Sequence, residues 1–140
     1  QHLMSLGIPL NTDSTLKGQT VFLAERCGEL MYDNIITDRT IIDVMAFTQC
    51  ASSIDSIDKK AFEEYARNFI REYDYIFYVS PEGIDMEDNG VRETNLEYRN
   101  LIDYTIQNIL SSQSPRAKNI TTITGTTEER IAQILNSTNS

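Results

Sequence analysis

An acidic and a basic side chain stand next to each other after a short apolar run. Asp38 and Arg39 follow the β-branched stretch 34–37 and precede Thr40, where a helical pattern begins. A carboxylate directly after a buried strand can hold Mg²⁺ or a Mg²⁺-bound water, and the guanidinium of an adjacent arginine can bind a phosphate. The same two side chains would also serve merely to solvate the end of a strand. The spacing leaves both interpretations open.

Two further arginines lie near the predicted start of a later helix. Arg92 follows Gly90 in an acidic segment, and Arg99 belongs to the first turns of the helix after it. Free N–H groups and the helix dipole favour an anion at such a place. Glycines at 83 and 90 would let this segment close over a ligand and exclude water. Arg99 is also spaced for a surface ion pair with Asp103, so this alternative stays open.

Two other positions are candidates for contacts with a ligand. The small-residue turn Gly125-Thr126-Thr127 follows a strand-like run, and small side chains let a flat ring such as a nucleobase approach the backbone. It is equally an ordinary strand-to-helix connection. Asp43 is a candidate substrate ligand. It is also a candidate helix cap, because an acid three residues after Thr40 is close to the capping-box pattern.

Helical periodicity and strand-like runs alternate along the chain, and these elements must position the candidate residues. The spacing of apolar residues predicts helices over 14–31, from Thr40 to about Cys50, over 58–72, from Thr94 to about Leu110, and from Thr126 to about Leu135. Strands are predicted at 34–37, 75–79 and 120–124.

This alternation predicts an α/β fold with a parallel sheet flanked by helices. In open parallel sheets ligands bind beyond the carboxyl ends of the strands, so we expect the three strand-to-helix junctions to converge on one anion pocket. Three strands make a thin sheet, so we expect the fold to be incomplete at the N-terminus. Residues 1–135 are assigned to one domain and 136–140 to a flexible tail.

Composition narrows the class of protein. A hydrophobic share of 40% indicates a globular chain, and the net charge of −9 argues against coating a nucleic acid. No apolar run approaches the roughly 20 residues of a membrane helix, and no signal-peptide pattern is seen. Two cysteines and one histidine, without a CxxC pair, argue against a zinc site. We therefore expect a cytoplasmic protein that binds neither membranes nor nucleic acid.

Several segments, taken in order, resemble a known family. They are Asp38–Phe47, Tyr73–Pro81, Asp88–Arg92 with Glu97-Tyr98-Arg99, the early piece Gly7–Asn11, and the closing Ile123–Gly125. Together they are similar to successive blocks of P-loop NTPases, the AAA-type ATPase and kinase domains that include nicotinamide-riboside kinase and the deoxynucleoside and deoxynucleotide kinases. The similarity covers nearly all of the 140 residues.

The resemblance implies a kinase-like three-layer sandwich and an ATP-dependent phosphotransferase that moves the γ-phosphoryl group to a small nucleoside-like acceptor. It implies ATP and Mg²⁺ as cofactors, with Asp38 as catalytic acid and metal ligand. Arg39 would contact the substrate, and Arg92 and Arg99 would be catalytic lid arginines. The turn at Gly125, Thr126 and Thr127 would contact the nucleotide on its base side. The expected partners are a nucleotide and a small acceptor, and association of identical chains stays open.

One family motif is missing. The 140 residues contain no G-x-x-x-x-G-K-[ST] run. By the family pattern the chain begins some 40 residues into the domain, after the first strand and the P-loop. We therefore expect the kinase activity in the full-length protein and little ATP binding by these residues alone. The alternatives are a non-catalytic binding or assembly module, or an ATPase that depends on a macromolecular partner.

Overall fold

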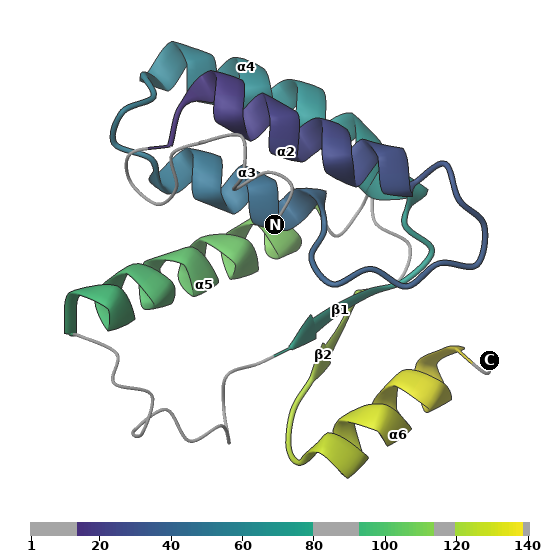
Figure 1. Cartoon of the computed structure of the whole chain (residues 1–140). Coiled ribbons are helices and arrows are strands. Elements are labelled where there is room, and N and C mark those ends of the chain that lie inside the picture. The colour runs from purple at the N-terminus through teal and green to yellow at the C-terminus, as the bar shows by residue number, and fades with distance from the viewer. Residues whose placement is uncertain (1–13, 80–92, 114–119, 139–140) are drawn as a thin grey trace.

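The computed structural model describes residues 14–79, 93–113 and 120–138 (Figure 1). Within these ranges the chain forms α2 (Leu16–Glu29), α3 (Ile41–Cys50), α4 (Ser56–Ala66), the 3₁₀ helix η2 (Arg67–Glu72), β1 (Ile76–Val79), α5 (Glu93–Gln113), β2 (Ile120–Ile123) and α6 (Thr127–Thr138). The predicted α/β class is confirmed. None of the described helices combines the length and the apolar composition that a membrane crossing requires.

The two described strands form a small parallel sheet. Ile76 pairs with Ile120 and Val79 with Ile123, and α5 is the crossover between the strands. Figure 1 shows α5 and α6 on opposite sides of these strands. On one side the Tyr78 hydroxyl is hydrogen-bonded to the Asp103 carboxylate of α5. On the other side the Gln133 amide of α6 bonds both the N–H and the carbonyl of Thr124, at 3.1 and 2.8 Å. The parallel pairing expected from the sequence is therefore present.

Helix α3 is the centre of the core. It contacts α2, α4, η2 and α5, and six of its ten residues are buried, five of them apolar. Ile41 and Met45 are 0% and 1% exposed, and they pack in one cluster with Leu23, Phe62 and Ile70. Burial of this apolar surface is the main favourable contribution to folding. It also fixes α3, and with it the turn that leads into α3.

The prediction of a buried strand at 34–37 is wrong for this structure. Residues 31–39 form the connection between α2 and α3, and the side chains of Ile35 and Ile36 are 47% and 97% exposed. Asn34 has a φ of +56°, in the left-handed region. An apolar β-branched run becomes a strand only where a neighbour accepts its hydrogen bonds. The two described strands pair only with each other, so this run has no partner among them.

The helix ends follow local capping signals. The predicted start of the last helix near Thr126 is confirmed, and there Thr126 and Glu129 exchange hydrogen bonds between side chain and backbone at 2.8 and 3.2 Å, as in a capping box. The helix predicted at 58–72 begins at Ser56, where Asp55 accepts from the Asp58 N–H at 2.8 Å, and it changes to η2 at Arg67. Helix α6 continues to Thr138, past its predicted end and into the predicted tail.

Candidate functional site

The backbone of Arg39 adopts an unusual conformation at the entrance to α3. Its φ is +87°, in the region that favours glycine, and its side chain is exposed. A non-glycine residue held in such a conformation costs on the order of 1–3 kcal/mol, and residues of this kind cluster at active sites and ligand clamps. The strain therefore marks Arg39 as a functional candidate on grounds that are independent of the sequence pattern.

Local contacts hold the Arg39 turn in this form. The Thr37 hydroxyl donates to the carbonyl of Arg39 at 3.0 Å. The guanidinium of Arg39 lies 5.9 Å from the ring centroid of Phe47, two turns further along α3. A cation over an aromatic face at this distance is attracted by the ring quadrupole. The exposed carboxylate-bearing residue Asp38 precedes Arg39, so an acid and an oriented cation share one turn.

The N-terminus of α3 has its own acceptors. The N–H of Ile41 donates to the Tyr73 hydroxyl at 3.0 Å, that of Ile42 to the Thr40 hydroxyl at 3.0 Å, and that of Asp43 to the Thr40 carbonyl at 3.1 Å. These groups are the ones that would bind an anion at a free helix N-terminus. An anion at this turn would therefore be held by the Arg39 side chain rather than by the helix end.

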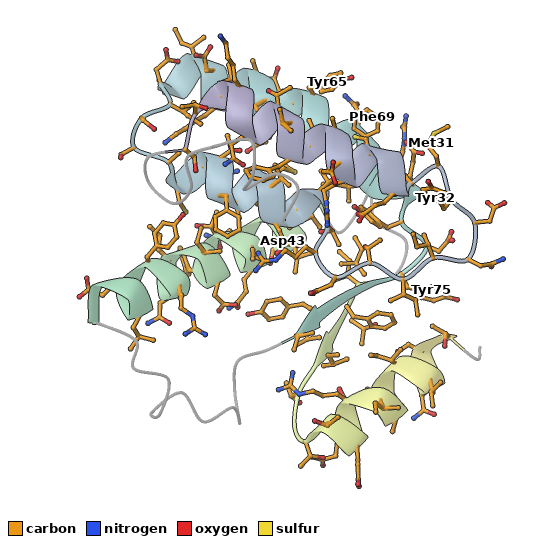
Figure 2. All side chains as sticks on the ribbon, in the orientation of Figure 1. Met31, Tyr32, Asp43, Tyr65, Phe69 and Tyr75 are labelled. Carbon is orange, nitrogen blue, oxygen red and sulfur yellow. The ribbon has the colours of Figure 1, made fainter. Side chains whose placement is uncertain are left out.

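Asp43 takes the capping role, one of the two roles that the sequence left open. Its carboxylate accepts from the backbone N–H of Thr40 at 2.7 Å and completes the capping box of α3. Burial raises the pKa of Asp43, while the hydrogen bond from Thr40 and the charge of Arg39 act in the opposite direction. Figure 2 labels Asp43 at the start of α3. The residue predicted as a substrate ligand thus organises the turn that carries Arg39.

Three residues that the sequence did not single out for chemistry contact this turn: Arg26, Phe47 and Tyr73. Arg26 donates from Nη1 to the carbonyl of Asp38 at 3.4 Å, and its Nε lies 3.4 Å from the Glu29 carboxylate. Burial raises the pKa of Tyr73 to about 12. Arg26 lies on α2, 12 positions before Asp38, and Tyr73 follows η2, 32 positions after Ile41, so no local motif could have indicated their contacts with the turn.

The arginines predicted on the later helix are only in part within the described structure. Arg92 lies outside the described residues, as do the glycines at 83 and 90. Arg99 is exposed on α5, directly after Tyr98. The Tyr98 ring lies 6.4 Å from that of Phe47, at an angle of 40°. Helix α5 therefore brings the neighbour of Arg99 to the same aromatic residue that underlies Arg39.

The turn at Gly125 does not join this cluster. Gly125 has a φ of +97°, and its carbonyl accepts from Nε of Arg130 at 2.8 Å. Thr126 caps α6 and Thr127 begins it. Figure 1 shows the β2–α6 turn apart from the start of α3, with the strands between them. The expectation that all three junctions converge on one pocket is therefore wrong for the junction at Asp38 and the junction at Gly125. Gly125 and Thr126 stabilise the connection between β2 and α6.

The described residues around Arg39 form no preformed metal cage. Among the described residues, no group of three or more His, Cys, Asp or Glu side chains could hold a metal ion. Mg²⁺ usually keeps several waters and is bound by one or two carboxylates together with substrate phosphates. The single exposed carboxylate of Asp38 is compatible with that mode of binding.

Comparisons with known proteins found no match. No family model matches the chain, and neither a curated protein nor a solved structure matches it. The residues and contacts around Arg39 are therefore what supports a function.

Proposed function

We propose that this protein is an ATP-dependent phosphotransferase of the nucleoside or nucleotide kinase type, which transfers the γ-phosphoryl group to a small nucleoside-like acceptor. One observation carries the proposal. Arg39 is held at a φ of +87°, with its guanidinium over Phe47, directly after an exposed acid. The arrangement costs free energy and presents a charged fork at the surface, which suits recognition of a phosphate.

In phosphoryl transfer the protein mainly positions groups and neutralises charge on the transferred group. In this proposal Arg39 binds oxygens of the phosphate, and its contact with Phe47 limits the directions in which the guanidinium can point. Asp38 supplies one carboxylate toward Mg²⁺, which neutralises phosphate charge when bound. The proposal also includes Arg92 and Arg99 as further cations that neutralise phosphate charge. It includes the P-loop kinase fold as well. The parallel pairing of β1 and β2 through α5 is compatible with that fold.

The test is a phosphoryl-transfer assay on the protein made from its complete reading frame. Labelled ATP and Mg²⁺ are offered with a panel of nucleosides and nucleotides, and labelled product is measured. We expect transfer to at least one acceptor, and a loss of about 10²–10³-fold in rate for Arg39→Ala, the size seen when one charge-stabilising donor is removed. Arg71→Ala is the matched control, because Arg71 is an exposed arginine on η2. Absence of transfer to every acceptor contradicts the proposal.

A second candidate function is an assembly module without catalysis. The exposed apolar side chains of the α2–α3 connection favour it, since Met31, Tyr32 and Ile36 are 84%, 68% and 97% exposed. Figure 2 shows Met31 and Tyr32 beside the end of α2. Apolar groups gathered in this way often mark a protein contact. Calorimetric titration of the protein from its complete reading frame with Mg·ATP separates the candidates, because micromolar binding argues against a module without a nucleotide site.

A further inference from the structure

We infer that Tyr73 and Arg26 are positioning residues for Arg39, which hold the two sides of its turn from neighbouring elements. The inference uses the proposed function only for its effect on catalysis. The geometric part, that these two side chains maintain the left-handed backbone of Arg39, stands on the contacts alone.

Tyr73 fixes the side of the turn that enters α3. It follows η2 as its capping residue, and its hydroxyl accepts the N–H of Ile41 at 3.0 Å, across 32 positions of the chain. Ile41 is fully buried, so a water molecule cannot readily replace the Tyr73 hydroxyl as acceptor for its N–H. The first N–H of α3 is thereby tied to the segment that leads into β1.

Arg26 fixes the side of the turn that leaves the α2–α3 connection. It lies in the last turn of α2 and donates to the carbonyl of Asp38 at 3.4 Å. The ion pair with Glu29, one turn further along the same helix, keeps its guanidinium in place. The carbonyl before Arg39 and the N–H two residues after it are therefore both bound to other elements.

A strained conformation persists only when its surroundings over-determine it. The internal contacts of the turn are the hydrogen bond from Thr37 and the approach to Phe47, and both depend on where the ends of the turn lie. Removal of either external contact should let Arg39 relax toward negative φ. Its guanidinium would then leave the Phe47 ring and no longer have a fixed direction.

Nuclear magnetic resonance of the 140-residue chain tests the geometric part. At positive φ the amide proton and Hα of a residue are close, so their nuclear Overhauser effect is strong. We expect this signal at Arg39 to weaken in Arg26→Met and in Tyr73→Phe, and to persist in Arg26→Lys, which keeps a donor. Arg71→Met serves as the control on η2. Amide exchange in β1, β2 and α5 should stay unchanged in the Arg26 variants, which separates positioning from loss of the fold.

The phosphoryl-transfer assay then tests the consequence. Displacement of a catalytic group by about 1 Å can cost around 10²-fold in rate. We therefore expect Arg26→Met to lower kcat by about that factor and to change KM by a much smaller factor. Arg26→Lys should restore most of the rate. An unchanged Arg39 signal in both Arg26→Met and Tyr73→Phe overturns the inference. If the signal weakens as expected while the wild type transfers no phosphoryl group, the positioning role is supported and the proposed function fails.

Discussion

Replacement of Arg39 by glycine separates the free-energy cost of the strained backbone from the role of the guanidinium in function. Glycine adopts positive φ without a steric penalty, whereas alanine keeps the strain and only removes the guanidinium. We therefore compare Arg39→Gly with Arg39→Ala, because both lose the contact with Phe47 and only one relieves the backbone. The pair should differ in stability and agree in loss of function.

The difference between the two variants follows from two terms, and a third term, the lost cation–π contact, is common to both. Left-handed backbone costs a non-glycine residue about 1–2 kcal/mol, and glycine loses about 0.5–1 kcal/mol more conformational entropy on folding. Arg39→Gly should therefore be more stable than Arg39→Ala by about 0.5–1 kcal/mol. The lost cation–π contact costs both variants about 0.5–1 kcal/mol at an exposed site. The glycine variant should thus be about as stable as the wild type, and the alanine variant less stable.

Equilibrium unfolding in guanidinium chloride measures this difference from the shift in midpoint at constant slope. Asn34→Gly is the matched control: Asn34 also has positive φ, at +56°, but asparagine tolerates this region, so its gain should be only a few tenths of a kcal/mol. The strain argument is refuted if Arg39→Gly proves less stable than Arg39→Ala.

Three further predictions concern Tyr73 beside the Arg39 turn, the separate turn at Gly125, and the core position Met45. The folded-state pKa of Tyr73, about 12, exceeds its ordinary value of 10.0, so its contribution to the free energy of unfolding is present below pH 10 and is lost as the pH rises through 12. Unfolding titrations over that range should show a loss of at most about 2 kcal/mol, allowing for partial exposure, and Tyr73→Phe should lack it. Gly125→Ala should lower stability by about 1–3 kcal/mol in thermal unfolding, because φ is +97° and the new Cβ would lie 2.5 Å from Oε1 of Glu129. Met45→Ala, at a position 1% exposed, should cost about 2–5 kcal/mol by chemical unfolding, whereas Met31→Ala, at 84%, should change stability by less than about 0.5 kcal/mol.

Elements with local signals were predictable from the sequence. The capping box of α3 was indicated by Thr40 and Asp43 alone, since both partners lie within one turn of helix. The strands at 76–79 and 120–123 were indicated by runs of β-branched and aromatic residues. Each residue of one strand has a partner in the other. The run at 34–37 is also rich in β-branched residues, yet whether it pairs depends on a partner elsewhere in the chain, and composition carries no information about that partner.

The candidate site was predictable only in the types of its residues. Asp38 and Arg39 were recognised from their place after an apolar run, but the turn with the positive φ of Arg39 is also contacted by Arg26 and Tyr73, and the local sequence does not encode these contacts. The hydrogen bond from Ile41 to Tyr73 spans 32 positions, and it forms because η2 and α3 pack on the same core. Convergence with the Gly125 turn failed for the same reason, because spacing along the chain does not fix the distance between separate junctions.

The most direct test of the central claim is phosphoryl transfer by the protein from its complete reading frame, with Arg39→Gly compared with the wild type. If Arg39 is strained in order to bind a phosphate, the wild type transfers phosphate from ATP to a nucleoside or nucleotide. The glycine variant, folded to the same stability, should then be slower by about 10²-fold or more. Equal rates in the two proteins would contradict the claim.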